Sequence, residues 1–193
     1  MQPQLILLNG TTSAGKSSIV KCLQQKLQSP YLDMGLDKFL YMLPEHYLKQ
    51  PLWEEVWGHA RCKGELGNRL MSGMHNSIRT MINSGNLVIA DHVLIEKNWV
   101  SELAELFHDQ PAYFIGVHCP LDVAEKREAD RKDRTLGSAR LQYSVVHQWA
   151  HYDFTVDSST MAPEKSAEKI IEFLASQTSP IGFAKTREQL KNI

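Results

Sequence analysis

The stretch LILLNGTTSAGKSSIVKCL, residues 5–23, joins an apolar run to an apolar-periodic segment through a loop of small polar residues. The loop, Gly10 to Ser17, fits the pattern G-x-x-x-x-G-K-[ST] at every fixed position. The run before it is a strand candidate and residues 17–28 after it are a helix candidate, which is the context that this pattern requires. The sequence therefore predicts a P-loop, a turn that binds the phosphates of a nucleoside triphosphate.

The spacing of this loop has a physical reason. Gly10 and Gly15 allow backbone conformations and close approaches that a Cβ atom would obstruct. Successive N–H groups can then point at the β- and γ-phosphates, reinforced by the positive end of the following helix. Lys16 supplies a point charge to the phosphates, and the Ser17 hydroxyl is placed to ligate Mg²⁺. The expected nucleotide-binding residues are Gly10, Thr11, Thr12, Ser13, Ala14, Gly15, Lys16, Ser17 and Ser18.

Short apolar runs recur along the rest of the chain, with segments of helical length between them. The strand candidates are Leu5–Leu8, Tyr31–Met34, Leu87–Ala90, Tyr113–His118 and Phe154–Val156. Such runs suit strands that are covered on both faces, as in a parallel sheet. The alternation of strand and helix candidates therefore predicts an α/β fold with a parallel sheet.

The clearest helix candidate is Glu65 to Asn83, which the Ser84-Gly85 pair ends. Its apolar stripe is Leu66, Leu70, Met74, Ile78 and Ile82. A polar group on another face, which is either solvated or faces a substrate, consists of Arg69, Ser72, Asn76 and Arg79. The last periodic helix is expected at about residues 163–175. Residues 41–64, rich in Trp, Tyr, His and Met, are either a substrate-covering insert or two short helices packed on the core.

Composition excludes several classes of protein. A chain of 193 residues suits one well-packed domain, and its net charge of -1 gives no general attraction for nucleic acid or an anionic membrane. No apolar run approaches the ~20 residues of a membrane span, and no signal peptide is recognisable. Cys22, Cys62 and Cys119 lack metal-ligand spacing and are expected to be reduced thiols. We expect a soluble, cytoplasmic protein without nucleic-acid or membrane partners; the oligomeric state stays open.

A P-loop does not say where the phosphate goes, and Asp37 bears on that question. It follows the second strand candidate, and the carboxyl ends of parallel strands line the crevice where ligands bind. A carboxylate there can accept the proton of a hydroxyl that attacks the γ-phosphate. The alternative is that Asp37 caps a helix N-terminus. Asp33 is a rival base, but as part of the strand candidate it is less suited to reach the crevice.

Asp91 ends the third strand candidate, in the stretch NLVIADHV. A strand-terminal acid beside a P-loop commonly orients the ligands of Mg²⁺, often through water. A purely structural hydrogen-bonding role is the alternative. His92 follows Asp91, and a lone histidine is more often structural than catalytic.

The stretch EKREADRKDRTLGSAR, residues 125–140, interleaves arginines with acids. As a helix ending in a mobile loop, it could bring Arg131 and Arg134 over the phosphates when the site closes. An arginine on the transferring group contributes ~10³–10⁵ in rate. A solvated helix with intrahelical ion pairs is the alternative.

Together these residues resemble the chloramphenicol phosphotransferase family, P-loop kinases of the nucleoside-monophosphate-kinase type. The similar segments are LLNGTTSAGKSSIVKCLQ (7–24), MGLDKF (34–39), READRKDR (127–134) and YSVVHQWAHYDFTVDSS (143–159), which includes His147, Tyr152, Asp153 and Asp157. The resemblance covers most of residues 5–174 and is weakest between Tyr41 and Gly64.

The resemblance implies a three-layer fold, a five-stranded parallel sheet flanked by helices, with a small lid at about residues 127–140. It places the family's catalytic base on Asp37 and its lid arginines on Arg131 and Arg134. The implied reaction moves the γ-phosphate of Mg·ATP to a hydroxyl of a small molecule, such as an antibiotic or a related metabolite. We expect one domain over residues 1–177 and a C-terminal extension over 178–193. A nucleoside or nucleotide kinase, or a nucleotide-binding regulatory module without transfer chemistry, are the alternatives.

Overall fold

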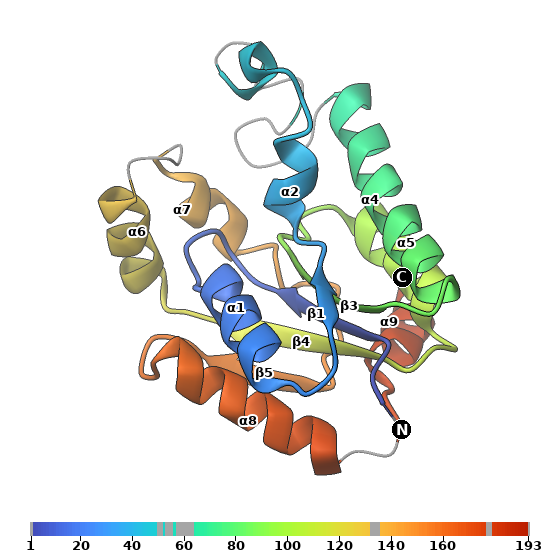
Figure 1. The fold of residues 1–193 in the computed structure, drawn as a ribbon. Coiled ribbons are helices and arrows are strands. Elements are labelled where there is room, and N and C mark those ends of the chain that lie inside the picture. Colours follow the sequence, from blue (N-terminus) through green and yellow to red (C-terminus); the bar gives the residue numbers. More distant parts are fainter. Residues whose placement is uncertain are drawn as a thin grey trace.

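A parallel five-stranded sheet forms the centre of the computed structural model (Figure 1), which describes residues 2–49, 52, 56, 64–131, 136–176 and 179–192. The strands are β1 (Leu5–Asn9), β2 (Tyr31–Asp33), β3 (Leu87–His92), β4 (Ala112–His118) and β5 (Phe154–Asp157). They are ordered β2-β3-β1-β4-β5, and every neighbouring pair is parallel. The predicted strands and the predicted fold class are confirmed.

Helices cover both faces of the sheet (Figure 1). Around the P-loop lie α1 (Lys16–Lys26), α6 (Leu121–Asp130), α7 (Ser138–Tyr143) and α8 (Pro163–Ser176). Elsewhere lie α2 (Leu36–Leu40), the 3₁₀ helix η1 (Glu45–Leu48), α4 (Glu65–Asn83), α5 (Lys97–Phe107) and α9 (Gly182–Lys191). None of the helices in the described ranges has the length and apolar character needed to cross a bilayer.

Alternation along the strands divides the core into two layers. Leu5 and Leu7 of β1 point to the side of α4, α5 and α9, where Phe183 is buried. Ile6 and Leu8 point to the side of α1 and α8. The central strands β1, β3 and β4 are buried on both faces over most of their length, so their sequences are apolar runs that can be recognised, whereas the edge strands β2 and β5 are partly exposed.

The polar face predicted for α4 contacts α5. Ser72 Oγ donates a hydrogen bond to Glu102 at 2.6 Å, and Arg79 donates to the backbone oxygen of Leu106 at 3.0 Å. Ser72 and Arg79 therefore pack against α5, whereas Arg69, paired with Glu65, and Asn76 are exposed, as the solvated interpretation predicts.

The apolar stripe of α4 also departs from the prediction at its N-terminal end. Met71 is fully buried, whereas Leu66 and Leu70 are only partly buried. The reason is visible in Figure 1, where the first turns of α4 project beyond the sheet.

The expected C-terminal extension contains α9, which packs on α5 and β4. Phe183 is 2% exposed, and its ring stacks on Phe114 of β4 with centroids 4.7 Å apart. Asp153 Oδ1 accepts hydrogen bonds from the N–H groups of Ile181 and Gly182 at 2.7 and 2.8 Å, and its Oδ2 accepts one from Phe114 N–H at 2.8 Å. The segment thereby completes one face of the core.

A Phe183→Ala variant should lower the free energy of unfolding by about 3–5 kcal/mol, because it removes a buried ring and leaves a cavity between α9 and the sheet. Urea unfolding followed by circular dichroism measures this difference. Ile181→Ala, at a side chain that is 47% exposed, is the matched control and should change stability little. A loss below about 1 kcal/mol in the Phe183 variant would mean that α9 is dispensable for the core.

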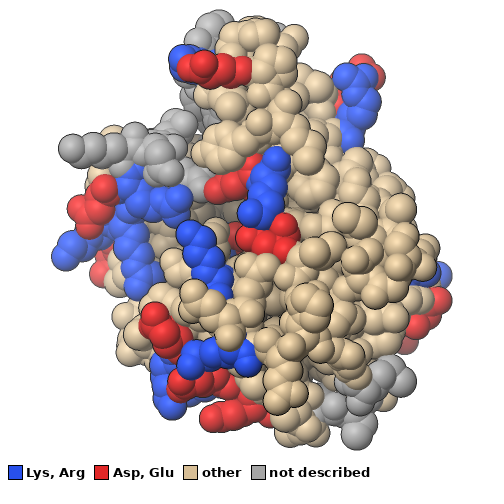
Figure 2. All heavy atoms as spheres, viewed as in Figure 1, with Lys and Arg blue, Asp and Glu red and all other residues tan. Residues whose placement is uncertain are grey.

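Charge is distributed without a single dominant sign. Figure 2 shows Lys and Arg side chains gathered over α6 and α7 with Asp and Glu among them. Near α2, acidic and basic side chains are again adjacent on this face. This intermingling agrees with the net charge of -1.

Candidate active site

The P-loop lies at the carboxyl end of the central strand β1 and leads into α1. Gly15 has φ = 85°, a left-handed conformation that favours glycine, and it is the N-cap residue of α1. Ser13 also has a positive φ, 59°. The Lys16 ammonium group is buried and donates hydrogen bonds to the backbone oxygens of Gly10 and Thr11 at 2.9 and 2.7 Å. The loop therefore curls around its own lysine, as the motif predicts.

Asp91 lies beside the P-loop because β3 is hydrogen-bonded to β1, with Asp91 in register with Leu8. Its Oδ2 accepts a hydrogen bond from Ser17 Oγ at 2.7 Å. Burial raises the pKa of Asp91, while the charge of Lys16 and the Ser17 hydrogen bond act against that rise. The two candidate Mg²⁺ ligands of the sequence are thus adjacent and both present oxygen.

Asp37 lies in the first turn of α2, whose N-cap residue is Gly35. The interpretation of Asp37 as the helix cap is therefore wrong. Gly35 allows α2 to approach β3 closely, since a Cβ atom there would overlap Asp91 Oδ1. Asp33, the rival carboxylate, accepts a hydrogen bond from Gly35 N–H at 3.0 Å and pairs with Lys38 at 3.1 Å.

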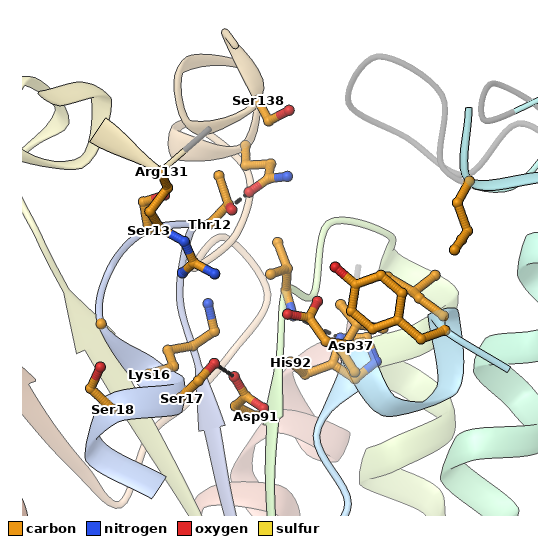
Figure 3. Close-up of a pocket in the computed structure, with 17 residues that line it drawn as sticks. Thr12, Ser13, Lys16, Ser17, Ser18, Asp37, Asp91, His92, Arg131 and Ser138 are labelled. Carbon is orange, nitrogen blue, oxygen red and sulfur yellow. Dashed lines mark hydrogen bonds between the residues drawn. The ribbon is translucent and has the colours of Figure 1, made fainter. Parts of the chain in front are cut away.

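A cavity of about 200 Å³ joins these groups. Its walls are Thr12, Ser13, Gly15, Lys16, Ser17, Ser18, Leu36, Asp37, Leu40, Tyr41, Leu48, Asp91, His92, Val93, Arg131, Ser138 and Gln142. In Figure 3, Lys16 and Arg131 approach the cavity from one side and Asp37 from the other. The structure brings Lys16, Ser17, Asp37, Asp91 and Arg131 to one cavity, and Asp33 is not part of its wall.

The segment predicted to be a lid, at about residues 127–140, begins in α6 and ends in α7. Glu128 of α6 is buried, and its carboxylate accepts hydrogen bonds from the N–H groups of Gly137 and Ala139 at 2.7 and 2.8 Å. It therefore fixes the start of α7 against α6. Arg131 follows the last residue of α6 and lines the cavity. Arg134 lies outside the described residues.

A second cavity of about 350 Å³ lies on the other side of the P-loop and shares Ser13, Gly15, Ser18 and Arg131 with the first. Its other walls are Ile19, Arg127, Asp130, Ser158, Met161 and Pro163. Arg127 is held there by a hydrogen bond to Ser158 O at 2.8 Å. Ser13 Oγ is buried and has no hydrogen-bond partner among the described residues, so it can bond to a ligand of the loop.

Asn9, the last residue of β1, anchors the P-loop to two other segments. Its side-chain N–H groups donate to Val146 O and Tyr152 Oη, both at 2.7 Å. Its Oδ1 accepts from Leu94 N–H at 2.8 Å. Every hydrogen-bonding position of the amide nitrogen is thus used to hold the end of β1 in place.

Tyr152 Oη, which accepts from Asn9, donates its own proton to His147 Nδ1 at 2.6 Å. His147 is therefore neutral, with Nδ1 unprotonated. Burial lowers the pKa of His147 to about 4, and the nearby charges of His118 and Lys16 act in the same direction.

We expect His147 to make the protein less stable in acid. The unfolded chain takes up a proton at the ordinary histidine pKa of 6.5, whereas the folded chain does so only at about 4. The contribution of His147 to the free energy of unfolding is therefore fully present above pH 6.5 and is lost as the pH falls to about 4. With a discount for the partial exposure of the ring, this loss amounts to roughly 2 kcal/mol. NMR titration of His147 and urea unfolding across this range measure both quantities.

His147→Gln should flatten this dependence, because glutamine does not titrate. The matched control is His46→Gln, at an exposed histidine, which should leave the pH dependence as in the parent. Equal slopes for the parent and His147→Gln would contradict the assignment of a neutral buried His147.

His92 belongs to a buried chain of hydrogen bonds. Its Nδ1 accepts from Val93 N–H at 2.8 Å, so its proton is on Nε2, which donates to His75 Nε2 at 3.1 Å. His75 Nδ1 then donates to Glu102 at 2.7 Å. Burial keeps the pKa of His92 well below its usual value. This chain supports the structural interpretation of His92, since both ring nitrogens are bonded inside the protein.

Sequence reasoning did not single out Asn9 or Glu128. Asn9 carried a usable signal, because a polar residue at the end of a fully apolar strand needs buried partners. Glu128 had no such signal among the alternating charges of its helix.

Comparisons with known proteins place the chain among phosphotransferases. A family model described as "Chloramphenicol phosphotransferase-like protein" matches residues 3–175. "Putative O-phosphotransferase Rv2636" of Mycobacterium tuberculosis is 26% identical over 200 residues, covering 96% of this chain and 88% of the relative.

Two solved structures show the same fold in kinases. A sugar kinase from Janibacter sp. HTCC2649 has a TM-score of 0.68 at 14% identity, covering 90% of this chain and 95% of that one. The Mycobacterium tuberculosis APS kinase CysC, solved with AMPPNP and APS, has a TM-score of 0.63 at 16% identity, covering 91% of this chain and 99% of that one.

Proposed function

The chain belongs to the chloramphenicol phosphotransferase-like family and is a small-molecule kinase, and we propose that it moves the γ-phosphoryl group of Mg·ATP to a hydroxyl of a small molecule. The observation that carries the proposal is that Lys16 of the P-loop and the Asp37 carboxylate face each other across the first cavity. Lys16 and Arg131 can neutralise phosphate oxygens, while Asp37 can take a proton from an acceptor on the opposite side. A nucleotide-binding regulatory module without transfer chemistry would need the two cations that bind phosphate, but not the carboxylate opposite them.

The two cavities suggest how ATP lies. Its phosphates would occupy the P-loop, where Ser13 Oγ has unused hydrogen-bonding capacity among the described residues. Its nucleoside would occupy the second cavity, between the Arg127 side chain and the apolar side chains of Met161 and Pro163. The acceptor would then enter the first cavity from the side of α2.

Ser17 and Asp91 fit a magnesium ion. Both present oxygen, the ligand type that Mg²⁺ prefers, and they lie 2.7 Å apart at the end of the P-loop. When bound with ATP, Mg²⁺ neutralises charge on the β- and γ-phosphates. Ser17 would ligate the ion directly and Asp91 through water.

In the proposed reaction the acceptor oxygen forms a bond to the γ-phosphorus as the bond from that phosphorus to the bridging oxygen of ADP breaks. Asp37 accepts the proton of the acceptor hydroxyl. Lys16 and Arg131 hold the oxygens of the transferring and leaving groups. The lid formed by α6 and α7 would keep water from competing with the acceptor.

The test is transfer of label from γ-labelled Mg·ATP to a panel of hydroxylated antibiotics, sugars and nucleosides. We expect a labelled product from at least one acceptor, and the productive member defines the acceptor class. A preference for nucleosides would identify a nucleoside kinase instead. Tight ATP binding without product across the panel would contradict the proposed transfer.

A further inference from the structure

Gln142, on α7, is a buried polar side chain at the wall of the first cavity. It is 2% exposed and lines the first cavity together with Thr12, Lys16 and Arg131. Its Oε1 accepts a hydrogen bond from the backbone N–H of Thr12 at 2.8 Å. A side chain from the lid helix thereby bonds directly to the P-loop.

This hydrogen bond fixes the orientation of the Gln142 amide. A backbone N–H can only donate, so the amide atom that faces Thr12 is the oxygen, and the nitrogen points the other way. Nε2 makes no hydrogen bond with any described residue, and it is not among the buried atoms that lack a partner, so it is accessible. Gln142 is a wall of the cavity, so the two N–H groups of Nε2 are available to a group that binds there.

The bond also changes the expected role of Thr12. Its N–H donates to Gln142 and is therefore engaged before any phosphate arrives. Oε1 and Nε2 share one carbon atom, so the amide takes one hydrogen bond from the loop and offers two donors of its own. The amide thereby adds donors to those of the P-loop backbone, in a cavity that Asp37 also lines.

We propose that Gln142 is a further catalytic residue that donates a hydrogen bond from Nε2 to the γ-phosphoryl group. This inference rests on the proposed function, because it requires Mg·ATP in the P-loop. Because Gln142 lines the same cavity as Asp37, the proposed base, we assign the donor to the transferring γ-phosphate and not to the β-phosphate. A preorganised donor at this place stabilises the charge of the transferring group, and loss of one such donor typically costs 10²–10³ in kcat.

Gln142→Glu separates this role from a purely structural one. Glutamate keeps an oxygen that accepts from Thr12 N–H, but it replaces the donor by an anion. The measurement is calorimetric binding of Mg·ADP and of Mg·AMPPNP, which differ in the γ-phosphoryl group. We expect affinity for AMPPNP to fall roughly ten- to a hundredfold and affinity for ADP to change less than about threefold. Turnover of the panel acceptor should fall by roughly 10²–10³.

The matched control is Gln148→Glu, which adds the same charge at an exposed position six residues farther along. It should bind both nucleotides as the parent does. Parent-like binding of AMPPNP by Gln142→Glu would overturn the inference, and so would equal losses for ADP and AMPPNP, which would show general damage to the P-loop. A parent protein that binds neither nucleotide would instead overturn the proposed function, and the inference with it.

Discussion

An Asp37→Asn variant is expected to lose roughly 10²–10⁴-fold in kcat while binding ATP about as tightly as the parent. Asparagine is close to aspartate in size and still offers an oxygen to the acceptor hydroxyl, but it cannot take the proton. Asp37 faces Lys16 and Arg131 across the cavity, so the change removes a base on the acceptor side and leaves the P-loop intact. Steady-state turnover with labelled ATP and the acceptor found by the panel measures kcat.

The matched control is Asp33→Asn. Asp33, like Asp37, is a carboxylate. It is the last residue of β2, and it pairs with Lys38 and accepts a hydrogen bond from Gly35 N–H. Its replacement should cost stability at the start of α2 and should leave most of the turnover. If the Asp33 variant lost activity and the Asp37 variant did not, the base would have been assigned to the wrong carboxylate.

The sheet could be predicted because its signals are local. The central strands β1, β3 and β4 are apolar runs buried on both faces over most of their length, and a polar or glycine-containing stop follows each run. The order of the strands in the sheet, in contrast, could not be predicted from local signals. β1 lies between β3 and β4, a topology that the P-loop context implies only through resemblance to a family.

The placement of the candidate site residues in one cavity was predictable where residue type and strand position point to the same edge of the sheet. Lys16 and Ser17 follow from the motif, and Asp91 follows from the rule that ligands bind at the carboxyl ends of parallel strands. The same rule pointed to Asp37, which follows β2. The structure adds that Gly35, which has no side chain, lets α2 approach Asp91 closely. Asp33 was the less suited candidate because it belongs to the strand candidate, and the resemblance then added support for Asp37 as the base.

The partners of the supporting residues could not be predicted, because they are remote in sequence. Gln142 meets Thr12 across 130 positions, and Asn9 meets Tyr152 across 143. A glutamine on a short helix has no periodicity that distinguishes a solvated position from one that reaches a phosphate cradle. Likewise, Phe183 is one aromatic residue in a polar segment, and only the fold shows that it stacks on β4.

These supporting contacts have a common consequence for the chemistry. Asn9 anchors the strand end before the P-loop, Glu128 fixes the start of α7, and Gln142 joins α7 to the loop. The helix α7 and the P-loop are thus one hydrogen-bonded unit. Preorganisation of this kind lets donors act on the transferring group without first reorienting.

Lys16→Ala is expected to lower kcat/KM by roughly 10³-fold or more, through both weaker nucleotide binding and slower transfer. Lys16 is the buried cation of the P-loop, and its ammonium group contacts the loop backbone at Gly10 and Thr11. Alanine removes the charge that the γ-phosphoryl oxygens would meet, and it also removes the lysine hydrogen bond from both backbone oxygens, of which Thr11 O keeps the one from Ala14 N–H at 3.3 Å. Turnover and calorimetric ATP binding measure the two effects separately.

Lys21→Ala is the matched control for that variant, since Lys21 is an exposed lysine on the same helix α1. Its loss removes one positive charge from α1 without touching the cradle, so turnover and ATP affinity should stay within about twofold of the parent. Equal losses in both variants would mean that the general charge of α1 is what attracts ATP. A folded Lys16→Ala protein that kept full turnover would exclude the P-loop lysine from transfer, and with it the proposed position of the γ-phosphate between Lys16 and Asp37.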